Sequence, residues 1–194
     1  MPDAGPFERE VVVVAQPERS RWRRYAGPAL TVSTAEGTQL ALVTNTDDTD
    51  FLLTDTSGRF LVRINRRFSW GQFGPVRFRF TGVTDREIGT ARTHGLIKSR
   101  QLSLRTEGGR QFLLTRLFDT TNEWRLTETD PEQNPAAEIL GRVAVSSIDP
   151  VLGLQQYVVE TDARLDVSER RTVIASVVSL HLVRRPPGDH GTSV

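Results

Sequence analysis

The chain has 194 residues, and its 25 Lys and Arg residues nearly balance its 24 Asp and Glu residues, leaving a formal net charge of +1. This balance excludes a general attraction to polyanions, so any such attraction must come from a local patch. The absence of cysteine excludes disulfides, thiolate metal sites and cysteine catalysis, while 37% hydrophobic and 25% charged residues indicate a soluble globular protein.

The N-terminal residues MPDAGPFERE contain no basic start followed by an apolar run, so we expect no secretory signal. No stretch approaches the roughly 20 apolar residues that span a bilayer. We therefore predict a cytoplasmic protein that would contact a membrane peripherally, at its inner face. We expect residues 1–9 to form a flexible N-terminus, residues 10–185 a single domain and residues 186–194 a flexible tail.

Seven segments between residues 10 and 161 have the pattern of β-structure. Residues 10–15 and 155–161 each predict one strand, and five segments between them predict hairpins. In each hairpin, two runs of alternating apolar and polar residues flank a turn rich in Gly, Asp, Ser, Asn or Pro. We expect Gly37, Gly58, Gly108 and Gly109 to supply the positive φ that tight turns need. The hairpins are 30–43, 51–64, 78–91, 102–116 and 124–145.

About twelve antiparallel strands cannot remain one flat open sheet, so they must close into a barrel or fold into a sandwich. The segment 166–183 breaks the strand pattern. Asp166 followed by Glu169 is typical of a helix capping box, with Ser168 as the alternative N-cap. Its β-branched residues favour a strand instead, but about 18 residues without a turn signal favour a helix.

The predicted C-terminal helix is apolar on nearly all sides, so it must be buried on nearly all sides. In a β-rich protein, the inside of a closed barrel is the place that can bury it. We therefore predict a mainly β fold, a closed antiparallel barrel of about twelve strands that encloses a hydrophobic C-terminal helix. The helix residues expected in the core are Val173, Ile174, Val177, Val178, Leu180 and Leu182.

Motifs of common enzymes and nucleotide-binding loops are missing from the sequence, so we predict a non-enzymatic protein without a metal ion or cofactor. The TNTDDTD segment at 44–50 is either a solvated turn or a weak cation site. His181 is either a ligand contact inside the barrel or a neutral core histidine. Ser176 and Ser179 are expected to hydrogen-bond to carbonyls of their own helix.

Arginine-rich segments are the best functional lead. Residues 57–84 contain six arginines and no acidic residue, and a second cluster surrounds Trp22. Arginine matches phosphate oxygens, and aromatic rings suit the headgroup level of a bilayer. Alternatively, these arginines face outward and pair with acids on neighbouring strands. The candidate phosphate-binding residues are Arg21, Arg23, Arg24, Arg63, Arg66 and Arg67, with Trp22 and Trp70 at the membrane interface.

Three segments carry a family resemblance: LGRVAVS at 140–146, LDVSERRTVIASVVSLHLV at 165–183, and FLLTDTSGRFLVR at 51–63. The first two resemble the C-terminal half of the phospholipid scramblases, and the third resembles a hairpin shared by scramblases and LURP-one-related proteins. The resemblance implies a tubby-like fold and a domain that binds anionic phospholipid headgroups. The LURP-one-related alternative implies a soluble structural domain that binds an unknown protein partner and has no lipid role. Nucleic acid is not an expected partner, because the net charge is small and no recognition helix is evident.

Overall fold

The computed structural model describes residues 5–17, 29–47, 49–68, 75–94, 100–116, 122–128, 134, 136–149 and 154–184, with the backbone alone at 148, 149 and 184. In these residues, twelve antiparallel strands form a closed barrel and one helix follows them, which confirms the predicted fold class. The elements are β1 (Val11–Ala15), β2 (Leu30–Ser33), β3 (Gln39–Asn45), β4 (Asp50–Asp55), β5 (Phe60–Phe68), β6 (Val76–Thr81), β7 (Glu87–His94), β8 (Gln101–Thr106), β9 (Gln111–Arg116), β10 (Glu123–Thr127), β11 (Ile139–Asp149), β12 (Leu154–Thr161) and α1 (Val167–Arg184).

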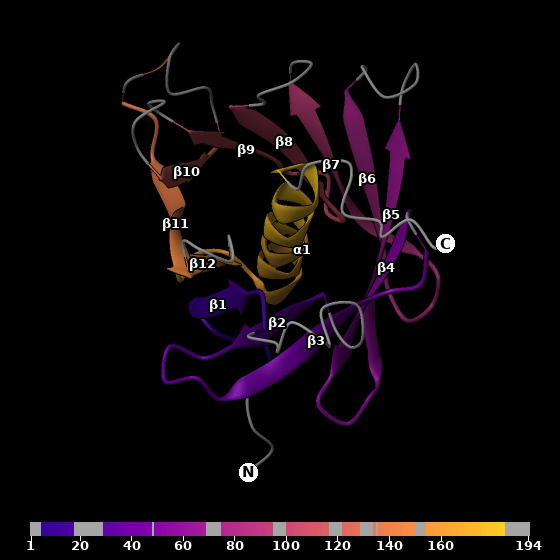
Figure 1. Cartoon of the computed structure of the whole chain (residues 1–194). Helices are drawn as coiled ribbons and strands as arrows, with labels where there is room; N and C mark the ends of the chain where they lie inside the picture. Colours follow the sequence, from indigo (N-terminus) through magenta and orange to yellow (C-terminus); the bar gives the residue numbers. More distant parts are fainter. Residues whose placement is uncertain are drawn as a thin grey trace, which may run out of the picture.

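Each strand pairs with the strand next to it in sequence, and β1 pairs with β12 to close the ring around α1 (Figure 1). The closing register runs from Val11 opposite Glu160 to Ala15 opposite Gln156. Closure removes the exposed sheet edges on which chains otherwise aggregate. The five predicted hairpins and the two further strands are all confirmed.

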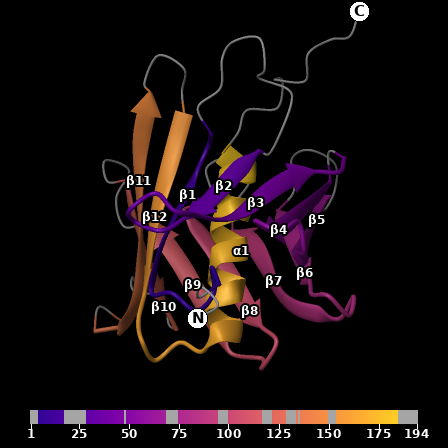
Figure 2. The same cartoon turned by 90° about the horizontal axis from the view of Figure 1, so that it is seen from below.

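Four hairpin turns have the same backbone form, and the strand order places them at the end of the barrel where β12 leads into α1. Figure 2 shows the connection from β12 to the start of α1. In each turn a residue with positive φ lets the strands reverse within a few residues. Gly37, Gly58 and Gly109 have φ of 89°, 84° and 84°, as predicted. Of the two adjacent candidates Gly108 and Gly109, Gly109 takes that conformation. In the turn at 82–86 the position is occupied by Asp85 with φ 57°.

The helix begins with the predicted capping box. The Asp166 carboxylate accepts a hydrogen bond from the Glu169 backbone N–H at 2.8 Å, and the Glu169 carboxylate accepts one from the Asp166 N–H at 3.0 Å. Asp166, and not the alternative Ser168, is therefore the N-cap. Ser176 and Ser179 donate to the carbonyls of Thr172 and Ala175, at 2.7 Å and 2.9 Å.

The helix α1 is enclosed by the barrel, and all six of its predicted core residues are at most 5% exposed. It approaches β7 closely at Gly89, where a Cβ atom would lie 2.8 Å from the Thr172 hydroxyl. Because the helix and the strand are so close here, the Thr172 hydroxyl donates a hydrogen bond to the Ile88 carbonyl at 3.2 Å. The glycine therefore sets the distance between helix and sheet.

No helix in the described residues is long and apolar enough to traverse a lipid bilayer.

Candidate anion-binding surface

The structure describes three of the residues predicted to contact a membrane, namely Arg63, Arg66 and Arg67 on β5. The other five, Arg21, Trp22, Arg23, Arg24 and Trp70, lie outside the described residues. The site is therefore built from β5 and its neighbours.

Strand alternation divides the three β5 arginines between the two sides of the barrel wall. Arg63 and Arg67 are exposed on the outer side. Arg66 lies opposite Phe78, which is 1% exposed, so Arg66 shares the inward-facing side of the sheet. Its guanidinium carbon lies 4.4 Å from the centre of the Phe68 ring. Arg66 is therefore not part of the outer surface that holds the other two.

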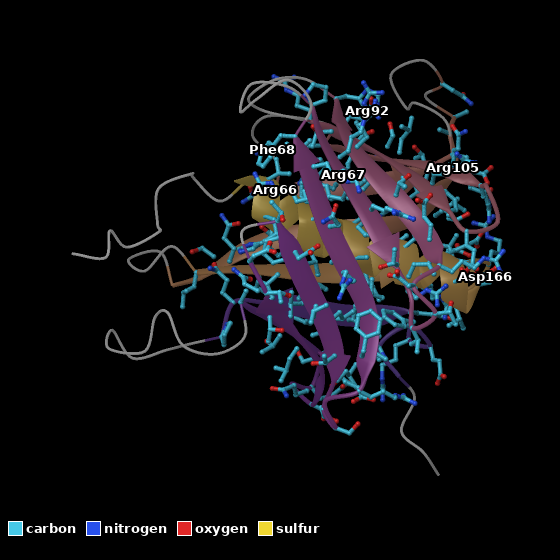
Figure 3. All side chains as sticks on the ribbon, turned by 90° about the vertical axis from the view of Figure 1, so that its right-hand side faces the viewer. Arg66, Arg67, Phe68, Arg92, Arg105 and Asp166 are labelled. Atoms are coloured by element: carbon cyan, nitrogen blue, oxygen red, sulfur yellow. The ribbon has the colours of Figure 1, made fainter. Side chains whose placement is uncertain are left out.

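The neighbouring strands add four exposed arginines that were not predicted as site residues. Arg67 lies opposite Arg77 on β6, and Arg77 lies opposite Arg92 on β7. Along the next row, Thr90 has Arg79 opposite it on one side and Arg105 on the other. We call this outer surface of β5–β8 the arginine face (Figure 3). It consists of Arg63, Arg67, Arg77, Arg79, Arg92 and Arg105.

Acidic partners are scarce on the arginine face. Arg79 forms an ion pair with Glu87 at 2.9 Å, and Arg67 donates to the Asn65 side-chain oxygen at 3.1 Å. Within the described residues, the other four arginines of this face form no ion pair and no side-chain hydrogen bond. On this face, the alternative prediction of pairing with an acid on an adjacent strand holds for Arg79. In the same segment, Arg59 likewise pairs with Asp55 of β4, at 3.0 Å. Since like charges directly opposite each other destabilise a sheet, the row Arg67–Arg77–Arg92 is costly without an anionic partner.

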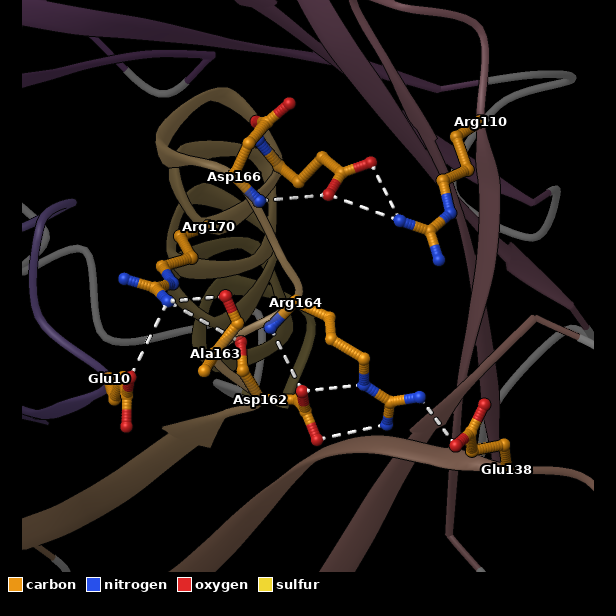
Figure 4. A network of polar contacts seen from close by, with 9 residues as sticks. Glu10, Arg110, Glu138, Asp162, Ala163, Arg164, Asp166 and Arg170 are labelled. Carbon is orange, nitrogen blue, oxygen red and sulfur yellow. Dashed lines mark hydrogen bonds and ion pairs between the residues drawn. The ribbon is translucent and has the colours of Figure 1, made fainter.

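Arginines at the N-terminal end of α1 have the opposite environment (Figure 4). Arg110 binds both carboxylate oxygens of Glu169, at 3.0 Å and 3.2 Å, and also pairs with Glu128. Arg164 pairs with Glu138 and with Asp162 at 2.8 Å. Hydrogen bonds from Arg164 lower the pKa of Asp162 to about 2. These positive charges are neutralised within the protein and hold the helix start to the barrel.

The other candidate groups have structural partners. His181 is 5% exposed, and its Nδ1 lies 3.2 Å from the Tyr157 hydroxyl, which supports the prediction of a core histidine. Asp47 accepts hydrogen bonds from the backbone of Thr49 and Asp50, at 2.6 Å and 2.7 Å, as in a turn. No group of three or more His, Asp or Glu side chains in the described residues is arranged to hold a metal ion.

Comparisons with known proteins identify no family for this chain. No protein-family model matches the chain, and neither a curated protein nor a solved structure matches it significantly. The resemblance to scramblases and LURP-one-related proteins therefore stays a prediction.

Proposed function

We propose that the protein binds membranes containing anionic phospholipid through the arginine face. The observation that supports this proposal is the row Arg67–Arg77–Arg92, in which three guanidinium groups lie on adjacent strands without an acidic partner among the described residues. The chain is nearly neutral overall, with a net charge of +1. These three arginines nevertheless lie together on one side of the barrel.

The chemistry of the arginine face suits an extended phosphate surface. Guanidinium groups bind phosphate oxygens in a bidentate manner, and these groups project from the outside of a barrel. Each basic group near an anionic membrane contributes about 1 kcal/mol, so five or six would give reversible binding. The binding should weaken with salt, because the Debye length falls to about 10 Å at 0.1 M ionic strength.

Vesicle sedimentation tests the proposal. The test variant is Arg77→Gln with Arg92→Gln, which removes two charges from the centre of the row. The control is Arg125→Gln with Arg142→Gln. These two arginines also lie opposite each other, on β10 and β11, but they have Glu123 and Glu160 as neighbours. Both double variants change the net charge equally, so they separate a local contact from a general electrostatic effect.

We expect the unaltered protein to sediment with phosphatidylserine-containing vesicles and not with phosphatidylcholine vesicles. The test variant should bind about thirtyfold more weakly, which corresponds to about 2 kcal/mol, and the control variant should lose less than about threefold. Equal losses in the two variants, or equal binding to both vesicle types, would contradict the proposal. So would a preference for a DNA duplex over anionic vesicles, which would assign the arginine face to nucleic acid.

A further inference from the structure

A cavity of about 530 Å³ lies at the end of the barrel where α1 begins, away from the outer surface of β6–β8. Its walls come from residues 5–9, from the turns that join β2 to β3 and β4 to β5, and from Val167 at the first position of α1. This volume lies within the range of about 300–1,000 Å³ that small-molecule sites occupy.

Arg9 is the cavity residue with unused hydrogen-bonding capacity. Its Nε atom is shielded from solvent and has no hydrogen-bond partner, and none of the described residues accepts a hydrogen bond from its guanidinium group. Since water cannot reach this Nε atom, a molecule in the cavity would contact the terminal Nη groups of the guanidinium instead. A ligand that supplies acceptor oxygens would give these Nη groups charge-assisted hydrogen bonds in place of water.

The other charged groups of the cavity already have partners. Asp55 accepts hydrogen bonds from Ser57 and Arg59, which lower its pKa and also engage Arg59. Glu8 accepts a hydrogen bond from the Gly5 backbone at 3.2 Å. A hydrogen bond from Thr34, together with the nearby positive charge of Arg9, lowers the pKa of Glu36. Asp55 and Glu36 are therefore ionised at neutral pH, and Arg9 is the charged group left to bind a ligand.

The cavity also has an apolar wall. Phe7 and Leu61 pack against the barrel core, Leu40 is 8% exposed, and Val167 is 50% exposed. A ligand body that covers these side chains would remove their apolar surface from water. The acidic side chains Glu8 and Glu36 are exposed and repel negative charge, so they disfavour a dianion more than a monoanion.

We propose that this cavity binds a small carboxylic acid that carries one negative charge and an apolar body. Its carboxylate accepts hydrogen bonds from Arg9, and its body lies against Phe7, Leu40 and Leu61. A ligand with a phosphate dianion is disfavoured by the acidic rim, and an amine is disfavoured by Arg9. This site is separate from the arginine face and does not depend on lipid binding.

The test is a titration of the ¹⁵N-labelled full chain with four probes that share one alkyl chain: hexanoate, hexanamide, hexylamine and hexyl phosphate. Hexanoate should bind most tightly and shift the amide signals of residues 5–9, 34–40 and 55–61. Arg9→Gln should weaken hexanoate binding about tenfold and change hexanamide binding less than about twofold, because the lost interaction is charge-assisted.

Two further variants keep the test decisive. Thr38→Trp adds bulk at the exposed rim of the cavity and should abolish hexanoate binding while the spectrum remains that of a folded protein. Arg77→Gln with Arg92→Gln should leave hexanoate binding unchanged, which distinguishes the cavity from the arginine face. The proposal is overturned if hexylamine or hexyl phosphate binds more tightly than hexanoate. It is equally overturned if the shifts lie elsewhere, or if Arg9→Gln has no effect.

Discussion

Arginines occur in two contrasting settings in this barrel. Around the start of α1, Arg110 pairs with Glu128 and Glu169, and Arg164 pairs with Glu138 and Asp162. Figure 4 shows these contacts except the one with Glu128. On the arginine face, the row Arg67–Arg77–Arg92 lies across three adjacent strands and has no carboxylate partner in the part of the chain that the structure describes. Figure 3 labels Arg67 and Arg92 of this row. The first arrangement uses positive charge to join elements that are far apart in the sequence. The second leaves positive charge available to a molecule outside the protein.

The contrast shows why arginine content alone is a poor guide to binding. At the helix start, carboxylates and guanidinium groups hold each other in ion pairs, so little charge remains for a partner. On the arginine face, mutual repulsion between the arginines opposes folding, and the proposed anionic partner would relieve it. Removing a charged side chain should therefore lower the free energy of unfolding at the helix start and raise it on the arginine face.

The largest effect is expected at Gly89, where β7 of the arginine face touches the helix. In Gly89→Ala, the added Cβ would lie 2.9 Å from the Arg105 carbonyl oxygen as well as 2.8 Å from the Thr172 hydroxyl. The backbone atoms of β8 cannot move aside easily, so overpacking should reduce the free energy of unfolding by about 3 kcal/mol. Urea denaturation measures this loss.

Gly108→Ala is the control for this change. Its added Cβ would meet nothing nearer than 4.0 Å, and Gly108 does not have a positive φ. It should change the free energy of unfolding by less than about 0.5 kcal/mol. A loss at Gly108 equal to that at Gly89 would show that the close approach of helix and sheet is not responsible.

Glu169 is expected to have the next largest effect, because it belongs to both the capping box and the Arg110 ion pair. Glu169→Ala removes both interactions and should cost about 2–3 kcal/mol in the free energy of unfolding. Glu169→Gln retains a side chain able to accept the Asp166 N–H, so it should cost about half as much. Thermal and urea unfolding of the two variants separate the cap from the ion pair; equal losses would assign the whole effect to the charge.

The sequence alone was sufficient to predict the strands, the turns and the capped helix. These features depend on local signals, namely period-two alternation, turn glycines and the Asp166–Glu169 pair. The inward position of Arg66 was also accessible from alternation, since Ile64, Arg66 and Phe68 share one side of a regular strand. Treating Arg63, Arg66 and Arg67 as one surface ignored that period.

The arginine row required information about strand register. Arg77 and Arg92 are 15 residues apart in sequence, and they lie opposite each other because the turn at 82–86 sets the pairing of β6 with β7. Glycine is absent from the positive-φ position of that turn, so its geometry was harder to predict from sequence. The place of Arg9 in the cavity was not predictable at all, because it depends on how turns from two hairpins meet residues 5–9.

Acid should weaken the helix-start cluster and leave the row Arg67–Arg77–Arg92, which contains no carboxylate, unaffected. The pKa of Asp162 is about 2 in the folded protein against an ordinary value of 3.8, so its ion pair stabilises the fold fully above pH 3.8. That contribution is lost as pH falls through about 2, since the carboxylate then takes up a proton in both states. The difference in urea midpoint between the protein and its Asp162→Asn variant should therefore shrink over this pH range. The difference produced by Arg77→Gln should stay constant, because arginine does not titrate there.

The smallest expected effect is a gain in stability on the arginine face. In Arg77→Thr, a β-branched residue replaces the central charge of the row, which removes repulsion from Arg67 and Arg92. The free energy of unfolding should rise by about 0.5 kcal/mol at low salt, and the gain should diminish as salt screens the charges. Arg142→Thr is the control, because Arg142 lies between Arg125 and Glu160 and removing it relieves no net repulsion. If Arg77→Thr lowers the free energy of unfolding instead, the row stabilises the fold. Its arginines could then not be explained by binding to an anionic surface alone.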